Sequence, residues 1–304
     1  MKNILYILAF SSLGLASCES FFSQTVEIDP PPYTKQLSFH VSVSDKDTAI
    51  KVIMTRNYGI LETVDNVDQY FVKNAKASLY KDGQLWLNLQ ALNADSTFVL
   101  VGALPSPLQA GSTYELRAEH PDFPTAIGKQ IMPGDFQVDS AQIKYDAATN
   151  PDGGRVDEVN IFMKDQAGVR NFYEVTLFET YYYIIYDEVN QELDTIGVYR
   201  QRVYPDNFPD ASIVNGAYGG ALLSDQFFDG QPYKFQLQVY AGNGNPVEVH
   251  IRNITEDYYK WSRSYYSQID AEENPLAEPV SVYNNLIDGL GNFSVAAEKV
   301  FLVQ

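Results

Sequence analysis

Apolar and polar residues alternate along much of this 304-residue chain, and this pattern constrains the fold more than any other feature. In the stretch LSFHVSVS, residues 37–44, every second side chain is apolar, as expected for one face of a β-strand. Similar stretches follow at residues 49–55, 75–83, 85–90, 97–103, 113–120 and 125–132. Turn sequences such as Lys81-Asp82-Gly83 separate them. Short strands at this spacing predict an immunoglobulin-like β-sandwich over residues 36–134.

A second β-rich domain is expected over residues 135–304. Its predicted strands are 136–145, 156–164, 171–188, 195–204, 233–241 and 247–253. One helix is expected near residues 255–269, because Thr255 is a good N-cap. Apolar residues recur around it at helical spacing, namely Ile254, Tyr258, Trp261, Tyr265 and Ile269. The predicted fold class is therefore mainly β, with an N-terminal sandwich followed by a second β-rich domain whose single helix covers a sheet.

The first 17 residues have the features of a signal peptide. An apolar run from Ile4 to Ala16 follows Lys2, and it is shorter than the roughly 20 residues that a membrane span needs. Residues 15–18, Leu-Ala-Ser-Cys, resemble a bacterial lipobox, in which cleavage before the cysteine is coupled to attachment of a diacylglycerol to its sulfur. We expect residues 1–17 to be removed, Cys18 to be lipidated and the proline-containing residues 18–35 to form a tether. An ordinary secretory signal with a chance cysteine is the alternative.

Cysteine content and charge narrow the classes of function. Cys18 is the only cysteine, so no disulfide framework is expected and the hydrophobic core must hold the fold. The formal net charge is −18, which argues against binding to nucleic acid or to anionic lipid head groups. The lipid anchor is therefore the expected contact with a membrane.

Candidates for catalysis are few. The three histidines, His40, His120 and His250, do not belong to a His-Glu-x-x-His pattern and do not accompany a nucleophile-elbow serine. Acidic pairs are frequent in so acidic a chain, so none of them indicates a glycosidase. The sequence predicts no catalytic residue and no cofactor.

One stretch was weighed as a metal site. Asp146, Asn150, Asp152 and Asp157 lie together in DAATNPDGGRVD, and their oxygens are of the kind that bind calcium. The stretch lacks the EF-hand pattern and its bidentate glutamate. We interpret it as a solvated turn between strands, and we expect no metal.

The aromatic stretch FETYYYIIYDE, residues 178–188, is the candidate contact surface. On a strand, Tyr181 and Tyr183 fall on one face, while Tyr182 and Tyr186 fall on the other. One interpretation is a strand buried between its sheet and the helix. The other is that one row of tyrosines contacts a ligand or partner, because tyrosine combines a rigid apolar ring with a hydroxyl.

The C-terminal part resembles a known family. The segment NPLAEP (274–279), followed by Asn285-Leu286, Gly289-Leu290-Gly291 and Phe293, is similar to the closing signature of the Bacteroidota lipoproteins grouped as domain of unknown function 4249. The stretches ASLYKDG, GSTYELRAEHPDF and FMKDQAGVRNFYEV agree with that pattern. The resemblance implies a β-rich outer-membrane lipoprotein, often encoded beside a TonB-dependent receptor, with no known catalytic residues. The glycines and apolar residues of the signature predict a C-terminal structural clasp.

Two classes of function follow. In the first, the protein is a non-enzymatic accessory or ligand-capture partner of a TonB-dependent transporter in nutrient uptake, which fits lipidation and the family resemblance. In the second, it is a free-standing surface binding or adhesion module without a transporter partner. The sequence names neither the ligand nor the side of the outer membrane that the protein faces.

Overall fold

The computed structural model describes residues 32–187, 192–240, 245–272, 274 and 276–304, without the side chains of residues 182–197. Two compact units result, one from Met1–Thr34 with Tyr58–Thr63 and the other from Lys35–Asn57 with Val64–Gln304. In the smaller unit the hydroxyl of Tyr33 donates a hydrogen bond of 2.7 Å to the carboxylate of Glu62. The predicted lipidation site, Cys18, lies outside the described residues.

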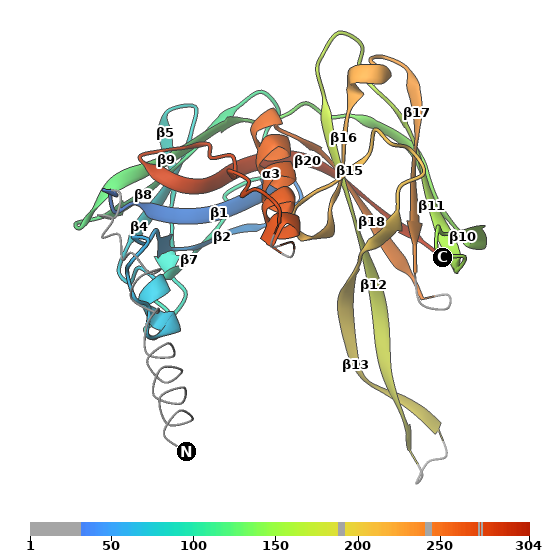
Figure 1. Cartoon of the computed structure of the whole chain (residues 1–304), viewed down its shortest axis with the longest axis horizontal. Helices are drawn as coiled ribbons and strands as arrows, with labels where there is room; N and C mark the ends of the chain where they lie inside the picture. The colour runs from blue at the N-terminus through green and yellow to red at the C-terminus, as the bar shows by residue number, and fades with distance from the viewer. Residues whose placement is uncertain (1–31, 188–191, 241–244, 273, 275) are drawn as a thin grey trace, which may run out of the picture. The chain divides into compact units, whose positions relative to one another are not determined.

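The larger unit is mainly β (Figure 1). Its strands are β1 (Leu37–Ser44), β2 (Ala49–Ile53), β3 (Thr55–Arg56), β4 (Lys76–Lys81), β5 (Gln84–Asn88), β6 (Gln90–Ala91), β7 (Val99–Ala103), β8 (Thr113–His120), β9 (Phe123–Ile131), β10 (Gln137–Thr149), β11 (Arg155–Lys164), β12 (Phe172–Asp187), β13 (Glu192–Val203), β14 (Pro205–Asn207), β15 (Val214–Asn215), β16 (Ala221–Ser224), β17 (Pro232–Val239), β18 (Val247–Ile254), β19 (Leu286–Ile287) and β20 (Gly289–Val303). Short 3-10 helices lie at η1 (Val67–Tyr70), η2 (Ala217–Gly219) and η3 (Asp225–Phe227), and the α-helix is α3 (Glu256–Glu272).

The longest sheet, which we call sheet A, has the strand order β15-β16-β12-β18-β20-β1-β3, with β13 also paired to β12. Strand β20 joins two parts of it. Its first residues pair in parallel with β1, from Leu37 opposite Gly289 onward, and its last residues pair antiparallel with β18, where Val247 lies opposite Val303. The C-terminal strand therefore connects the first predicted β region to the second.

Three smaller sheets complete the unit, with the orders β10-β11-β17-β14, β19-β9-β8-β4-β5 and β2-β7-β6. One continuous hydrophobic cluster runs through them and sheet A, and it includes Leu37, Tyr114, Ile161, Val249 and Phe293. The predicted mainly β fold with one helix is confirmed. The expected domain boundary near residue 134 falls between β9 and β10, and it stays a prediction.

Helix α3 begins where Thr255 caps it, with the Thr255 hydroxyl accepting a 3.3 Å hydrogen bond from the backbone N–H of Tyr258. Tyr258 and Trp261 are buried against a second apolar cluster that contains Phe172. The helix continues to Glu272, beyond its expected end, and its last residues Ile269, Asp270 and Glu272 are exposed. It packs against sheet A near the middle of the molecule, where it contacts β20, β12 and β15 (Figure 1).

The C-terminal signature forms a hydrogen-bonded bend. The side-chain oxygen of Asn284 accepts from the N–H of Gly291 at 2.9 Å, and its amide donates to the carbonyl of Gly289 at 3.0 Å. Asn285 exchanges two hydrogen bonds with the backbone of Phe293, at 2.9 and 2.8 Å. These bonds fix the chain reversal that leads into β20.

Candidate functional site

A cleft of 560 Å³ lies on the polar face of sheet A, beside α3 and η2. Residues of β1, β12, β13, β18 and β20 line it. Arg200, Arg202, Arg252 and Lys46 all contribute, which concentrates cations in a chain whose net charge is −18. We call this feature the arginine cleft.

Strand alternation explains why these polar side chains meet. On β18, Val249 and Ile251 are fully buried in the core, so His250 and Arg252 lie on the opposite face. The two arginines of β13 lie two residues apart and share a face for the same reason. Because side chains alternate along each strand, burial of the apolar residues in the core places the charged residues together on the opposite face of the sheet.

Arg252 is held by a buried ion pair. Its guanidinium lies 3.0 Å from the carboxylate of Glu174, and the two side chains are only 14% and 2% exposed. The other oxygen of Glu174 accepts a 2.9 Å hydrogen bond from the hydroxyl of Tyr258, and Arg252 also donates to the hydroxyl of Ser42. Burial, reinforced by the negative charge of Glu174, raises the pKa of Tyr258. This network fixes the floor of the cleft.

A second charged network crosses the cleft from β13 to β20. Arg200 lies 2.7 Å from Glu248, and its guanidinium carbon lies 3.7 Å from the ring centroid of Phe178. The two ring nitrogens of His250 contact Glu248 at 3.1 Å and Glu298 at 2.6 Å. Burial acts to raise the pKa of Glu298, but the hydrogen bond with His250 and neighbouring donors outweigh it, so the pKa lies below its usual value.

Arg202 differs from the other two arginines. The ion pairs of the described residues use Arg200 and Arg252 but not Arg202. Its guanidinium lies 5.4 Å from the ring centroid of Phe178, and its Nε is buried without a hydrogen-bond partner. Arg202 is therefore the arginine of the cleft whose charge no carboxylate compensates.

Aromatic rings form one wall. His40 lies 5.1 Å from Trp261, which stacks on Tyr265 at 5.4 Å, measured between ring centroids. Tyr218, on η2, lies 5.4 Å from Tyr265 and keeps 54% of its surface exposed. Burial, together with neighbouring Tyr265, raises the pKa of Tyr218 to about 12. The wall thus ends in an accessible neutral ring at the cleft.

The second candidate is a two-stranded ribbon formed by β12 and β13 (Figure 1). Up to Thr180, β12 also contacts its neighbour in sheet A. Beyond that residue, within the described part of the chain, β12 pairs with β13 alone. One extra residue on β13, Ile196, forms a bulge opposite Tyr183 and Ile184.

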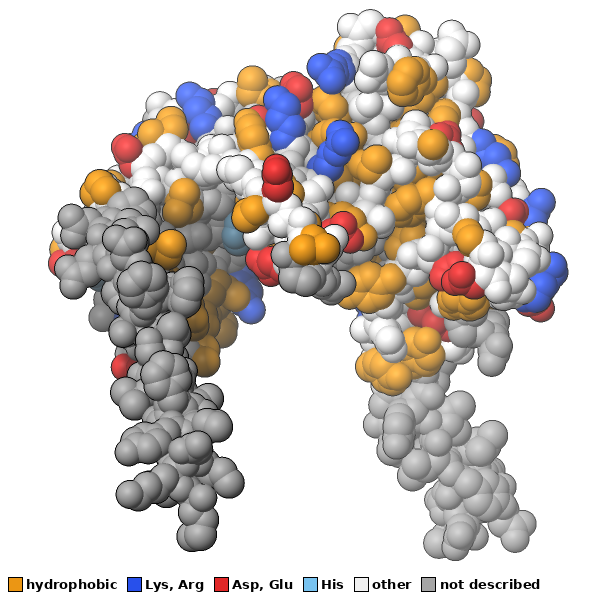
Figure 2. Space-filling view, viewed as in Figure 1, with side chains coloured by type: hydrophobic (Ala, Val, Ile, Leu, Met, Phe, Trp, Pro, Cys, Tyr) orange, Lys and Arg blue, Asp and Glu red, His pale blue; other side chains and the backbone are white. Residues whose placement is uncertain are grey.

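All four predicted contact tyrosines lie on this ribbon. Tyr181 stacks on Tyr199 across the strands at 5.1 Å, and its hydroxyl donates a 2.6 Å hydrogen bond to Glu179. That hydrogen bond raises the pKa of Tyr181 to about 12. Backbone pairing places Tyr182, Tyr183 and Tyr186 opposite Val198, Gly197 and Leu193, while the side chains of those three tyrosines lie outside the described residues. Hydrophobic side chains gather where the ribbon meets the part drawn in grey (Figure 2).

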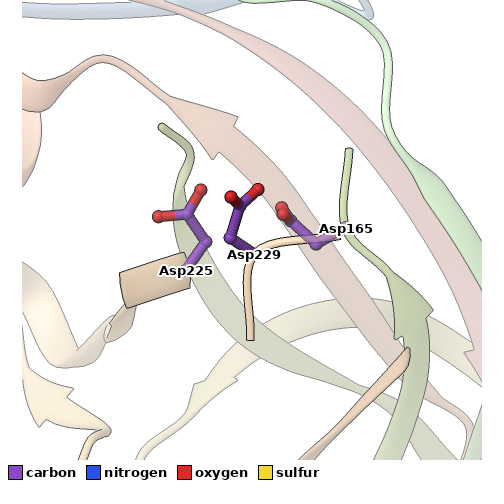
Figure 3. Close-up of side chains that lie close together, drawn as sticks. All are labelled: Asp165, Asp225 and Asp229. Atoms are coloured by element: carbon purple, nitrogen blue, oxygen red, sulfur yellow. The ribbon is translucent and has the colours of Figure 1, made fainter. Parts of the chain in front are cut away.

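Three carboxylates meet elsewhere, on Asp165, Asp225 and Asp229 (Figure 3). One oxygen of each lies within 4.8 Å of the others. Internal donors already hold them: the hydroxyl of Tyr173 donates to Asp165 at 2.5 Å, and the N–H of Gly168 donates to Asp229 at 2.7 Å. Burial and the two neighbouring charges raise the pKa of Asp225, as expected for a buried carboxylate beside two like charges.

The candidate calcium stretch, residues 146–157, runs from the end of β10 through the turn at residues 150–154 into the start of β11. The side chain of Asn150 accepts from the N–H of Gly154 at 2.7 Å and donates to Asp206 and to Tyr240, each at 2.9 Å. Asp157 accepts from the backbone N–H of Asp146 at 2.8 Å. These bonds brace a turn between strands.

Sequence reasoning missed the arginine cleft. Its residues come from β1, β12, β13, β18, β20 and α3, which are far apart along the chain. The stretch YRQRVY, residues 199–204, could have indicated part of it, because two arginines that lie two residues apart on a strand share one face. Only the sheet order shows that they face Arg252.

The fold and these sites define a mainly β protein with a cationic cleft and a projecting ribbon. A family model described as domain of unknown function (DUF4249) matches residues 23–301, and the chain belongs to this family. No curated protein matches the chain. None of the helices in the described ranges has the length and apolar character needed to cross a bilayer.

Solved structures are only remotely similar. A DUF4785 family protein from Legionella pneumophila is 16% identical, with a TM-score of 0.20, over 74% of this chain and 53% of that chain. A putative membrane anchored protein from Corynebacterium diphtheriae is 12% identical, with a TM-score of 0.21, over 88% of this chain and 61% of that one. The B domain of a biofilm associated protein is 7% identical, with a TM-score of 0.18, over 91% and 88%. The chain thus spans about half the length of the first of these structures.

Proposed function

We propose that the protein is a lipid-anchored, non-enzymatic accessory of an outer-membrane TonB-dependent transporter, and that it contacts the transporter through the β12–β13 ribbon. The observation that carries this proposal is the ribbon itself, which beyond Thr180 has no third strand among the described residues. The lipobox-like sequence that ends at Cys18 and membership of the family support an outer-membrane lipoprotein.

An isolated two-stranded hairpin is marginally stable in water, and each of its edges presents unpaired N–H and C=O groups. A partner that adds a strand pairs the N–H and C=O groups of one edge, and a partner that covers a face buries its apolar side chains. The two faces offer apolar contacts, since Val198 is 61% exposed and its neighbour Tyr199, on the opposite face, is 52% exposed. A shared membrane raises the effective concentration of the two proteins, so a modest interface suffices.

The alternative is a free-standing surface binding module. The arginine cleft supports it, because a cleft of this size can hold a ligand without a protein partner.

Co-purification tests the proposal. The full lipoprotein is extracted in mild detergent after crosslinking, as wild type and as the variants Val198→Asp and Tyr199→Asp, which change one face of the ribbon each. The control is Leu276→Asp, because Leu276 is 92% exposed and lies outside the ribbon. Recovery of a barrel with wild type and control, and its loss in one ribbon variant, supports docking. Recovery of the wild type alone replaces this function with the free-standing module.

The tyrosine rows extend the same test. Tyr181 with Tyr183, and Tyr182 with Tyr186, are changed to serine in pairs. One pair should weaken co-purification more than the other, because the two rows lie on opposite faces of the ribbon and the partner is expected to contact one of them.

A further inference from the structure

One guanidinium of the arginine cleft, that of Arg202, makes no ion pair with a carboxylate among the described residues. Glu248 compensates Arg200 and Glu174 compensates Arg252, while Arg202 is left without a carboxylate partner. A partly buried cation without a counter-charge is costly, and removal of that cost is a source of binding energy for an anion. A guanidinium presents a planar fork that matches a carboxylate.

Unsatisfied polar atoms are concentrated at the same place. Among the described residues, seven buried side-chain nitrogen or oxygen atoms have no partner, and four of them belong to Arg202, Arg252, Trp261 and Asn292, which line the cleft. Trp261 and Asn292 are only 2% and 1% exposed. A buried polar atom without a partner destabilises the folded protein, so a cluster of such atoms at one cleft requires an explanation.

The volume of the arginine cleft and the residues that line it indicate what else the ligand contains besides an anionic group. The volume of 560 Å³ exceeds that of one small ion and accommodates a six-membered ring with its substituents. Tyr218 offers an exposed ring face, on which the C–H groups of a saturated ring can stack. The hydroxyls of Ser42 and Thr176 line the cleft and can exchange hydrogen bonds with ligand hydroxyls.

We propose that the arginine cleft binds a sugar carboxylate of the uronic acid class, with its carboxylate on Arg202 and its ring against Tyr218. A phosphate dianion fits less well, because Glu174, Glu298 and Asp47 also line the cleft and only one guanidinium lacks a counter-charge. This inference is independent of the transporter contact, which uses the ribbon beyond Thr180, because Arg202 lies opposite Phe178, where β12 still pairs with β18.

The test is calorimetric titration of the full lipoprotein in detergent with D-glucuronate, D-glucose and inorganic phosphate. We expect glucuronate to bind at least roughly tenfold more tightly than either of the others, since one charge-assisted bidentate contact contributes about 1.5–3 kcal/mol. Arg202→Gln should weaken glucuronate binding at least roughly tenfold by the same contact. Arg202→Lys, which keeps the charge and loses the fork, should fall between the two.

The matched control is Arg263→Gln, which removes an exposed arginine of α3 outside the cleft. Thermal unfolding of every variant confirms that it is folded. Glucuronate binding that is absent, that equals glucose binding, or that survives Arg202→Gln in a folded protein overturns the proposal. Barrel co-purification is measured on the same samples: it should persist in Arg202→Gln, so a failed transporter function and a failed cleft assignment give different results.

Discussion

Gly291 of β20 lies against the carbonyl oxygen of Phe39 on β1, so closely that a Cβ at position 291 would overlap that oxygen. Its φ of +123° is a conformation that residues with a Cβ rarely adopt. Gly289, two residues earlier, is also tightly packed, because a Cβ there would lie 2.5 Å from the Cβ of Ala126 on β9. The family signature therefore contains glycine where two strands and a neighbouring sheet meet.

Replacing Gly291 with alanine should lower the free energy of unfolding by about 2 kcal/mol or more, through overlap with Phe39 and backbone strain. Urea unfolding followed by circular dichroism measures the change. Gly134→Ala is the matched control, because nothing lies within 4 Å of a Cβ there and its φ is not positive. Equal stability of the two variants would refute the tight fit at Gly291.

The pair Glu174 and Arg252 should show strong coupling. Arg252→Met leaves the buried carboxylate of Glu174 without its cation, and we expect a loss of about 3–5 kcal/mol. The double variant with Glu174→Leu removes both charges and should recover most of that loss. A double-mutant cycle from chemical denaturation gives the coupling. Additive losses would show that the two side chains do not interact.

Stability should fall in acid because of Glu298. Its pKa in the folded protein lies below the ordinary 4.5, so the unfolded chain takes up a proton first as the pH falls. Its contribution is complete above pH 4.5 and is lost as the pH decreases through the folded-state pKa. Glu298→Gln should therefore reduce the urea midpoint at pH 6 and approach the wild type below pH 4.5. A constant difference across this range would contradict the assignment.

Asp225 should behave in the opposite way. Its pKa is raised, so its negative charge opposes folding at neutral pH, and the contribution of the protonated form is lost as the pH rises through that pKa. Asp225→Asn should leave the melting temperature at pH 7 unchanged or higher.

We also expect EDTA to leave the melting temperature of the wild type unchanged, because internal donors hold the carboxylates of Asp165 and Asp229. A marked fall of the melting temperature with EDTA would indicate a bound cation instead.

If Cys18 carries the lipid anchor, as we propose, Cys18→Ser should release the protein from membranes or leave residues 1–17 uncleaved. Membrane fractionation and the intact mass of the mature protein are the measurements. An unmodified Cys18 in the wild type would remove the anchor from the proposed function.

Local patterns predicted much of the fold. Residues 37–44 were expected as a strand and form β1, and Thr255 caps α3 as expected. Both the alternation of apolar residues and the helix cap depend only on residues close together in the sequence. β20 was predicted only as a clasp. Its burial does not alternate, because residues 292–297 are buried on both faces of sheet A, and its glycines mask the strand pattern.

The candidate site was harder to predict. The tyrosines were visible as a run, while the cleft depends on the order of strands in sheet A. Arg202 and Arg252 come to one cleft only because β13 and β18 both flank β12. The spacing of apolar residues within one strand does not specify the order of the strands in sheet A, which depends on how all the strands together bury their apolar face.

The pairing of β1 with β20 also sets the order of folding. Leu37 begins the first strand of the described residues and Gly289 begins the last one, yet they are neighbours in the sheet. Loop closure over nearly the whole chain is slow, and until it occurs the edge of β1 stays open to other strands. A nascent chain therefore cannot complete sheet A before its last residues emerge, and its early strands need protection from aggregation until they do.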